Sequence, residues 1–194
     1  VVSTFDAAAQ VAAVQAVASK GPTTKTDGLR IGLAAVRPGT GEVLAVYGGP
    51  DFATEPFNNA TQSSAQAGST FKPFALAAAT EAGVGLDTLL PGKSGTTIAG
   101  YKVNNYSGES WKKPITLLYA TEPSVNTAYV QLPYDIGVDA VMNAAQRAGI
   151  PDSTLGLERN LTFVLGTASP HPIDVADAYA TFAARGVHAD PYVI

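Results

Sequence analysis

The sequence predicts an α+β fold in which an antiparallel β-sheet is flanked by α-helices. Two short apolar runs joined by a Pro-Gly turn indicate a hairpin of that sheet, and several alanine-rich stretches of helical period indicate the helices. With 194 residues, of which 46% are hydrophobic and 14% charged, the chain is long enough for one substantial core. We therefore expect one domain rather than two complete ones.

The first helix is expected to begin after Asp6 and to end at Lys20. Asp6 is a candidate N-cap, the residues after it are rich in alanine, and Gly21 is a candidate C-terminal stop. At helical spacing, the face expected to pack against the rest of the chain carries Val11, Val14 and Ala18.

A hairpin is expected next, because two apolar runs are separated by a short reversing segment. The runs extend from Arg30 to Val36 and from Val43 to Tyr47, and Pro38-Gly39-Thr40-Gly41 lies between them. Proline and glycine in this arrangement are typical of a turn between antiparallel strands.

The next helix is expected from Ser69 to Gly83, and its start follows from one proline. Pro73 has no N–H group, so it is tolerated only in the first turn, where the amides have no intrahelical partner. The helix should therefore begin close to Ser69.

The rest of the chain alternates between loops and helices. Leu86 to Lys113 is dense in Gly, Pro, Asn, Ser and Thr and predicts turns with short strands at most. Pro133 is expected to end a helix, and Tyr192-Val193-Ile194 is expected to begin a strand. The helices are expected at Ile115 to Ala120, Asn126 to Leu132, Val138 to Ala148 and Pro172 to Ala184.

Composition excludes several classes of function. The net charge of −4 and the pI near 5.0 argue against nucleic acid as a partner, and without cysteine there is no thiolate nucleophile or cysteine-ligated zinc. His171 and His188 stand alone, so we expect no metal site and no cofactor, and capping or surface roles suffice for them. No stretch approaches the roughly 20 apolar residues that span a bilayer, and a soluble chain is expected.

Ser69-Thr70-Phe71-Lys72 is an S-x-x-K tetrad at the expected helix start. The spacing puts the Lys72 amine on the same helix face as the Ser69 hydroxyl. A serine needs a neighbouring base to become a nucleophile, and a lysine can be that base if burial and the helix dipole lower its pKa. The alternative is ordinary: Ser69 caps the helix and Lys72 is solvated.

Ser124-Val125-Asn126 is a second polar motif, and it precedes a predicted helix. The Ser124 hydroxyl could relay a proton between Lys72 and a leaving amine, and the Asn126 amide could bind a peptide backbone. The alternative is again a helix cap, in which one of these side chains satisfies free amides.

Together these motifs resemble a known family. Gly68-Ser69-Thr70-Phe71-Lys72-Pro73-Phe74 with Ser124-Val125-Asn126 looks like the transpeptidase domain of class A penicillin-binding proteins. Arg37 to Gly49 resembles the hairpin of that family, and Phe57 to Thr61 resembles its F-N-R-A-T segment with Asn59 in place of Arg. Further matches, in the expected order, are Asn105-Tyr106, Tyr119-Ala120, Gly149-Ile150 and Leu165-Gly166-Thr167.

The resemblance implies a serine β-lactamase/D,D-transpeptidase-like fold and a peptidoglycan D,D-transpeptidase activity. It assigns Ser69 as the nucleophile, Lys72 as its base, Ser124 as a proton shuttle and Asn126 as a substrate-binding residue. It also implies peptidoglycan stem peptides as substrates, β-lactams as covalent inhibitors, and a glycosyltransferase domain in a membrane-anchored full-length protein. The domain would act at the extracytoplasmic face of a bacterial membrane.

The third motif of the family, K-T-G, should follow Asn126 and does not occur there. Lys25-Thr26-Asp27 and Lys93-Ser94-Gly95 look similar, but both lie upstream, and we interpret each as a polar turn. By resemblance, residues 1–29 are a linker leading into the domain, and residues 30–194 are its N-terminal portion.

Both ends of the chain are apolar and lie in expected structured segments, so a fragment is expected, with K-T-G past Ile194. In the family, the strand with the third motif provides one of the two oxyanion-hole amides. Losing such a donor lowers the rate about 10²–10³-fold, so the 194 residues alone are expected to be inactive.

Two other readings stay open at this point. A serine β-lactamase or D,D-carboxypeptidase would use the same tetrad and differ in what attacks the acyl-enzyme. A non-catalytic module that binds β-lactams or cell wall would keep the fold without the turnover.

Overall fold

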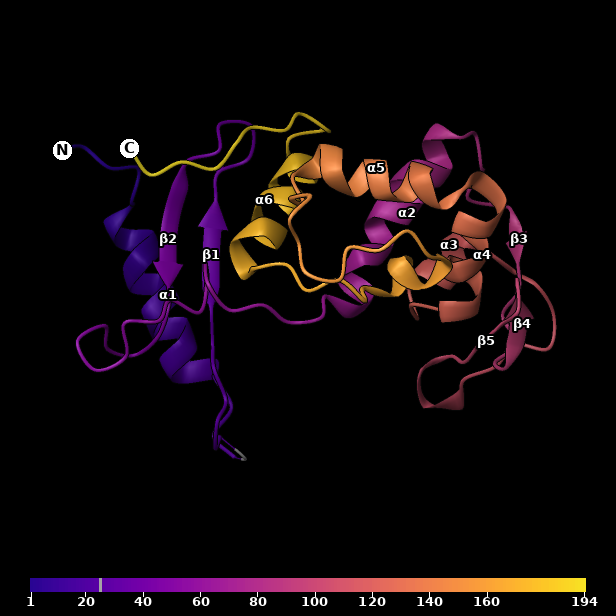
Figure 1. Cartoon of the computed structure of the whole chain (residues 1–194), viewed down its shortest axis with the longest axis horizontal. Coiled ribbons are helices and arrows are strands. Elements are labelled where there is room, and N and C mark those ends of the chain that lie inside the picture. Colours follow the sequence, from indigo (N-terminus) through magenta and orange to yellow (C-terminus); the bar gives the residue numbers. More distant parts are fainter. Residues whose placement is uncertain (25) are drawn as a thin grey trace. The chain divides into compact units, whose positions relative to one another are not determined.

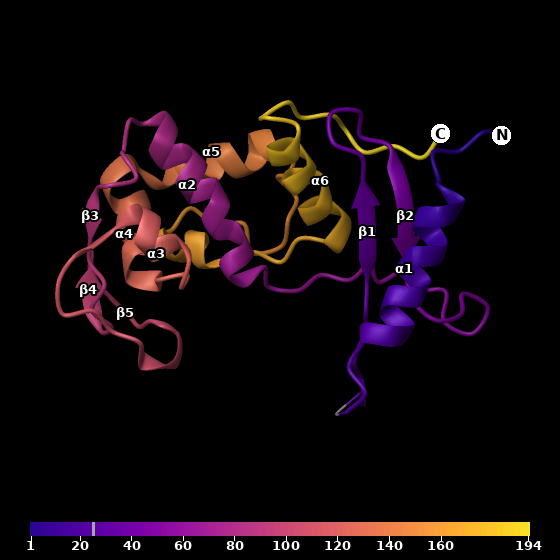
Figure 2. The same cartoon turned by 180° about the vertical axis from the view of Figure 1, so that it is seen from behind.

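The computed structural model describes residues 1–24 and 26–194, and within it the chain forms two compact units (Figures 1 and 2). Lys25, the first residue of one K-T-G look-alike, lies outside the described residues. Helices accompany small antiparallel sheets throughout, which confirms the predicted α+β class. The first unit contains Val1–Ala65, Arg147–Leu155 and Pro170–Ile194, and the second contains Gln66–Gln146 and Gly156–Ser169.

The first unit is built on the predicted hairpin. Strands β1 (Leu33–Val36) and β2 (Val43–Tyr47) pair antiparallel, and the register shifts between Ala35 and Val36, where Leu44 is an extra residue in β2. Helix α1 (Ala7–Lys20) packs beside β2, and α6 (Pro172–Ala183) packs beside β1, as Figure 1 shows. Tyr192 forms a parallel bridge with Glu42, which agrees with a strand beginning near the C-terminus.

Helix α1 has the predicted ends but not the predicted packed face. Asp6 caps it by accepting a hydrogen bond from the Ala9 amide at 2.7 Å, and the Gly21 amide closes its last turn. Val11 and Val14 are exposed, to 55% and 46%, whereas Ala13 is buried. The apolar side chains of α1 are distributed around the whole helix, so their periodicity alone could not predict which face packs against the chain.

Gln10 explains which face of α1 is turned inward. Its side-chain amide donates to the Val46 carbonyl and accepts from the Val46 amide, both at 2.9 Å. One glutamine side chain thus satisfies both backbone groups of an edge residue in β2. A polar contact, rather than the valines, orients this helix.

The second unit consists mainly of helices, with two-stranded ribbons at one end. β3 pairs with β6 and β4 with β5, both antiparallel, which confirms that Leu86 to Lys113 forms short strands at most. Its helical elements are η1 (Gly68–Phe71), α2 (Lys72–Glu81), η2 (Tyr106–Gly108), α3 (Leu117–Thr121), α4 (Asn126–Ile136), all but the last two residues of α5 (Val138–Ala148), and η3 (Leu161–Leu165). Its strands are β3 (Leu89–Leu90), β4 (Thr96–Ile98), β5 (Tyr101–Val103) and β6 (Ile115–Thr116).

Pro133 does not end the helix as predicted. It lies within α4, which continues to Ile136 and ends at Gly137, where φ is +91°. Pro133 and its neighbour Leu132 are both buried, so packing compensates for the hydrogen bond that proline cannot donate. Burial of this segment in the core therefore outweighs the helix-breaking effect of Pro133.

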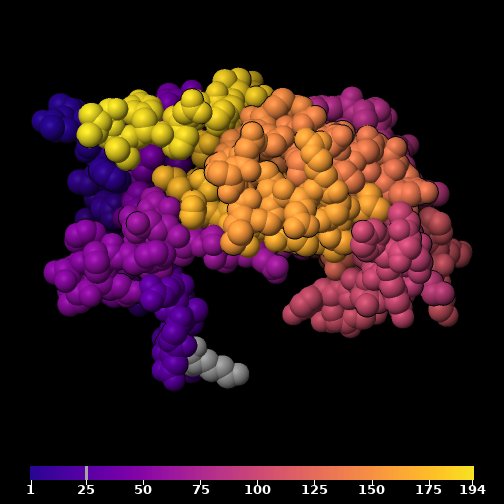
Figure 3. All heavy atoms as spheres, in the orientation of Figure 1, coloured from indigo at the N-terminus to yellow at the C-terminus, as the bar shows by residue number. Residues whose placement is uncertain are grey.

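Three phenylalanine rings form the centre of the second unit. Phe71 makes edge-to-face contacts with Phe74, at 5.3 Å between ring centroids, and with Phe163, at 5.2 Å, and all three are at most 1% exposed. In the space-filling view, α5 and the segment around η3 form a continuous surface on one face of this unit (Figure 3). Phe71 comes two residues after Ser69, so this core holds the turn that carries the serine.

Among the described residues, none of the helices combines the length and the apolar character that crossing a lipid bilayer requires.

Candidate active site

Ser69 lies in the short 3-10 turn η1 and is exposed, immediately before α2. Pro73 is in the first turn of α2, where the sequence placed it. The N-cap of α2 is Phe71, and no side chain caps this end. Ser69 is therefore not a cap of α2, and its hydroxyl is accessible from outside.

The Lys72 amine links all the predicted site residues. Its Nζ lies 3.1 Å from Ser69 Oγ, which fits the predicted shared face of the tetrad. It also donates to the carbonyl oxygen of Ser124 at 2.5 Å, to Ser124 Oγ at 2.8 Å and to Asn126 Oδ1 at 2.7 Å. The structure thus brings together Ser69, Lys72, Ser124 and Asn126 from two segments that are about 50 residues apart.

Burial changes the acidity of this amine. Lys72 is only 4% exposed, and the desolvation of its charged form lowers its pKa from 10.5 to about 8. All four oxygens that it contacts are neutral, so no carboxylate among them opposes the shift. The lowered pKa increases the fraction of the amine that is neutral near pH 7, and only the neutral amine can accept a proton. The amine also lies 5.6 Å from the centre of the Tyr129 ring.

Ser124 and Asn126 are turned toward the amine rather than used as helix caps. The N-cap of α4 is Val125, which has no polar side chain, and no side-chain cap bond is formed there. Ser124 has a φ of +58°, an unusual value for a residue other than glycine. This backbone conformation directs both its carbonyl and its hydroxyl to Lys72, and strain of this kind is often concentrated at functional sites.

Sequence reasoning missed the residues that support this cluster. Asn126 Nδ2 donates to the Asn104 carbonyl at 2.9 Å, and the buried side chain of Asn105 contacts Thr127. The centre of the Tyr129 ring lies 5.6 Å from the Lys72 amine, and its phenol oxygen is 2.8 Å from Thr121 Oγ1. The partners of Asn126 and Asn105 lie 22 residues away in the sequence, so no local pattern predicts these two contacts, and only the resemblance at Asn105-Tyr106 included a residue of this segment.

The turn that carries Ser69 rests on a backbone contact. The Gly68 amide donates to the Gly166 carbonyl at 3.1 Å, and the Ala67 amide donates to the Ala168 carbonyl at 2.9 Å. Gly166 has a φ of +69°, and a Cβ at this position would overlap the Gly68 carbonyl oxygen. Glycine is therefore required beneath the serine turn.

The remaining polar residues singled out in the sequence lie elsewhere. His171 is at the N-cap of α6, and its amide donates to the Asp174 carboxylate at 2.9 Å, so the predicted capping role is confirmed. His188 pairs with buried Asp177 at 2.9 Å. Ser94 of the Lys93-Ser94-Gly95 look-alike lies in the segment before β4 and contacts the Asn105 amide.

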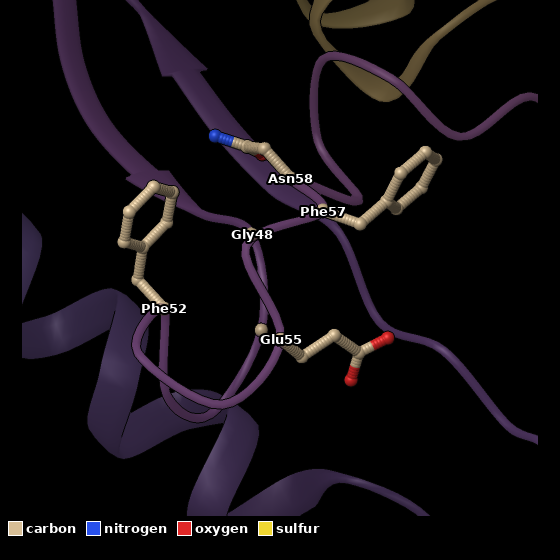
Figure 4. Close-up of a pocket in the computed structure, with 6 residues that line it drawn as sticks. Gly48, Phe52, Glu55, Phe57 and Asn58 are labelled. Atoms are coloured by element: carbon tan, nitrogen blue, oxygen red, sulfur yellow. The ribbon is translucent and has the colours of Figure 1, made fainter.

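A pocket in the first unit does not involve the predicted site. It lies at the end of β2 and is lined by Gly48, Gly49, Phe52, Glu55, Phe57 and Asn58 (Figure 4). Glu55 is ion-paired with Arg30, whose guanidinium also lies over the ring of Phe57 at 5.6 Å. No residue in this lining is a serine, lysine or histidine, so the pocket contains none of the predicted catalytic residues.

A family model described as "Penicillin binding protein transpeptidase domain" matches residues 31–194. Penicillin-binding protein 1A of Mycobacterium tuberculosis is 35% identical and covers 100% of this chain. Penicillin-binding protein 2D of Bacillus subtilis is 33% identical over 86% of it. In both cases the chain spans 24% of the length of the relative.

Solved structures give the same result for the fold. The structure of the PonA1 protein from Mycobacterium tuberculosis in complex with penicillin V matches with a TM-score of 0.89 and 37% identity, covering 100% of this chain and 53% of that one. Penicillin-binding protein A from the same organism, as a penicillin G acyl-enzyme complex, matches with a TM-score of 0.82 at 24% identity, which supports the fold alone. These comparisons do not favour a β-lactamase, a carboxypeptidase or a non-catalytic module.

Proposed function

We propose that this chain, which belongs to the penicillin-binding protein transpeptidase family, carries the nucleophile part of a peptidoglycan D,D-transpeptidase site. The family makes it a serine acyltransferase-type domain. The substrate is proposed to be the D-Ala-D-Ala end of a stem peptide. One observation carries the proposal: a buried lysine amine contacts both an exposed serine hydroxyl and a second serine hydroxyl.

In the first step, Ser69 Oγ attacks the carbonyl carbon of the penultimate D-alanine. The hydroxyl proton moves to the neutral amine of Lys72, which lies 3.1 Å away. The bond from the carbonyl carbon to the terminal D-alanine nitrogen then breaks, and that nitrogen receives a proton from Lys72 through the Ser124 hydroxyl. The products are a Ser69 ester and free D-alanine.

In the second step, an amine of a neighbouring stem peptide attacks the ester. Its proton passes by way of Ser124 to Lys72, and the bond from the carbonyl carbon to Ser69 Oγ breaks. Ser69 recovers a proton from the amine of Lys72, and the new amide bond is the cross-link. The 2.8 Å contact between Lys72 Nζ and Ser124 Oγ supports this relay in both directions.

Asn126 is proposed to hold the donor peptide, or the side chain of a β-lactam. Its Oδ1 accepts from Lys72 and one Nδ2 proton is donated to the Asn104 carbonyl. An amide group carries two donors, and among the described residues the second Nδ2 proton has no partner. A peptide carbonyl is the group that such a donor recognises.

The rest of the full-length protein is also a matter of proposal. K-T-G does not follow Asn126 in these 194 residues, and the chain spans 53% of the matched PonA1 chain. We propose that a downstream strand with K-T-G provides the second oxyanion amide, so that the 194 residues alone do not acylate. Residues 1–29 are proposed as the linker from a glycosyltransferase domain, in a membrane-anchored protein that acts outside the cytoplasm.

Labelling with a fluorescent penicillin tests this function in the full-length protein, meaning a polypeptide with these residues and a downstream K-T-G. We expect a stable covalent label, and a D-Ala-D-Ala peptide should compete with the penicillin and reduce the labelling. The label should be lost in Ser69→Ala. It should be kept in Ser153→Ala, which changes an exposed serine outside the site. No label on the unaltered protein would refute the enzymatic function and leave a binding module. A label that is released within minutes would indicate a hydrolase.

A further inference from the structure

The first turn of α4 is capped by a residue from a distant segment. Val125 at the N-cap has no group that could accept the free amides of this turn, and the Thr127 amide is buried. That amide donates to Asn105 Oδ1 at 3.0 Å. The Thr127 hydroxyl has a single proton and lies 2.8 Å from the Pro91 carbonyl and 3.2 Å from Asn105 Oδ1. We assign this proton to the shorter contact, with Pro91. Asn105 therefore acts as the N-cap side chain that α4 lacks.

All the hydrogen-bonding groups of the Asn105 side chain are used within the second unit. Its Nδ2 donates to the Gly92 carbonyl at 2.9 Å and to the Glu109 carbonyl at 3.0 Å. The residue is 6% exposed, so these bonds form away from water and a lost partner would be left unsatisfied. Asn105 thus fixes the segment before β4, the segment after η2 and the start of α4 to one another.

The peptide bond between Asn104 and Asn105 is held from both sides. Its N–H donates to Ser94 Oγ at 3.0 Å, and its carbonyl accepts from Asn126 Nδ2 at 2.9 Å. With both polar groups engaged, the plane of this peptide cannot rotate freely. Ser94 belongs to the Lys93-Ser94-Gly95 look-alike. This turn therefore supports the 104–105 peptide and does not act as a K-T-G strand.

This peptide decides which way the Asn126 amide points. Because the Asn104 carbonyl needs a donor, the NH₂ group of Asn126 must face it, and the oxygen must face the other way. That oxygen is the one that accepts from Lys72 Nζ at 2.7 Å. A chain of contacts therefore runs from Asn105 through its own peptide bond and Asn126 to the amine.

We propose that Asn105 is a positioning residue of the acylation site, which acts by holding the 104–105 peptide and the first turn of α4 so that Asn126 presents Oδ1 to Lys72. It contacts neither the substrate nor the reacting atoms. The inference rests on the proposed function, because it needs Ser69 to be acylated. The first contact shell of a site performs well only when its supporting shell holds it in place.

A double-mutant cycle in the full-length protein tests this role. The variants are Asn105→Ala, Asn126→Ala and both together, and the readout is acylation by a fluorescent penicillin, separated into non-covalent affinity and acylation rate constant. We expect Asn105→Ala to lower the rate constant by about 10- to 100-fold, with the affinity changed less than about threefold. In the Asn126→Ala background the same change should lower it by less than about twofold. Asn143→Ser, at an exposed asparagine of α5, is the control and should leave the rate unaltered.

The outcomes separate positioning from mere support of the fold. The inference would be overturned if Asn105→Ala lowered the acylation rate constant equally with and without Asn126, or if a folded Asn105→Ala protein showed no decrease. In both cases Ser69 would still be labelled, so the proposed function would stand. If Asn105→Ala does not fold, Ser94→Ala takes its place in the cycle, because it removes only the acceptor of the peptide N–H. It should lower the rate constant about threefold, and only when Asn126 is present; an unchanged rate would refute the role. Absence of a Ser69 adduct in the unaltered protein would instead refute the proposed function.

Discussion

Lys72 in the second unit and Asp177 in the first are both buried, yet their surroundings differ. They are exposed to 4% and 3%, and burial lowers the pKa of the Lys72 amine and raises the pKa of the Asp177 carboxyl. In each case desolvation favours the neutral form. A perturbed pKa alone therefore does not distinguish a candidate catalytic group from a structural one.

The contacts of the two groups make the distinction. Lys72 reaches four oxygens, one of which belongs to the exposed Ser69. Asp177 pairs through one oxygen with His188, and among the described residues its other oxygen is buried without a partner. The backbone at Gly149 closes over this pair, since a Cβ there would overlap the carboxylate. Asp177 is thus enclosed by its own unit, whereas Lys72 borders a reachable nucleophile.

The largest test of this contrast replaces each buried group by a neutral one of similar size. Lys72→Met is expected to lower the rate of Ser69 acylation by penicillin about 10²–10⁴-fold, because the base is lost. Asp177→Asn is expected to change it less than about threefold, since Asn keeps the shape and lies outside the site. Stopped-flow labelling of the full-length protein measures both. Comparable losses in the two variants would contradict the contrast.

A second test compares two glycines of the second unit that share a positive φ. Gly166→Ala adds both strain, at φ +69°, and an overlap with the Gly68 carbonyl, whereas Gly108→Ala, at φ +75°, has nothing within 4 Å. The first is expected to destabilise the serine turn by about 2–4 kcal/mol, and the second by about 1 kcal/mol. Hydrogen–deuterium exchange of the peptide from Gly68 to Phe74 measures the difference. Equal protection in the two variants would show that this turn does not depend on Gly166.

The smallest effect is expected in the first unit, where Gln10 and Gln15 lie on the same helix. Gln10→Ala removes two hydrogen bonds to Val46, and Gln15→Ala changes an exposed side chain. We expect faster hydrogen–deuterium exchange of the β2 amides in Gln10→Ala, equivalent to a decrease of about 1–2 kcal/mol in the free energy of local opening. Little change is expected in Gln15→Ala. Acylation should be unaffected by either. A loss of acylation in Gln10→Ala but not in Gln15→Ala would show that acylation at Ser69 depends on the packing of α1 in the first unit.

Much of this structure could be predicted from local chemistry. The proline after the tetrad placed the start of α2 close to Ser69, and Asp6 and Gly21 located the ends of α1, because caps and breakers act within one turn. The spacing within the tetrad predicted the contact between Ser69 and Lys72, whereas the resemblance to the family assigned Ser124 and Asn126 to the same site. The helix ends and the contact within the tetrad depend on neighbours within a few residues.

What could not be predicted depends on partners far away in the sequence. The packed face of α1 is set by Gln10 bonding to a strand 36 residues later, and α4 continues through Pro133 because its surroundings bury it. Asn105 looks like an ordinary loop asparagine until the chain folds it against Thr127, 22 residues away. No local pattern encodes such contacts.

The pH dependence of acylation tests the central claim that neutral Lys72 activates Ser69. The pKa of Lys72 is lowered to about 8, so the neutral fraction of the amine rises as the pH passes through that value. Between about pH 6 and 9.5 the rate constant for penicillin acylation of the full-length protein should increase with a midpoint near 8 and then level off. A rate that is flat or falling over this range, or that still rises steeply at its upper end as expected for an ordinary lysine, would contradict the account.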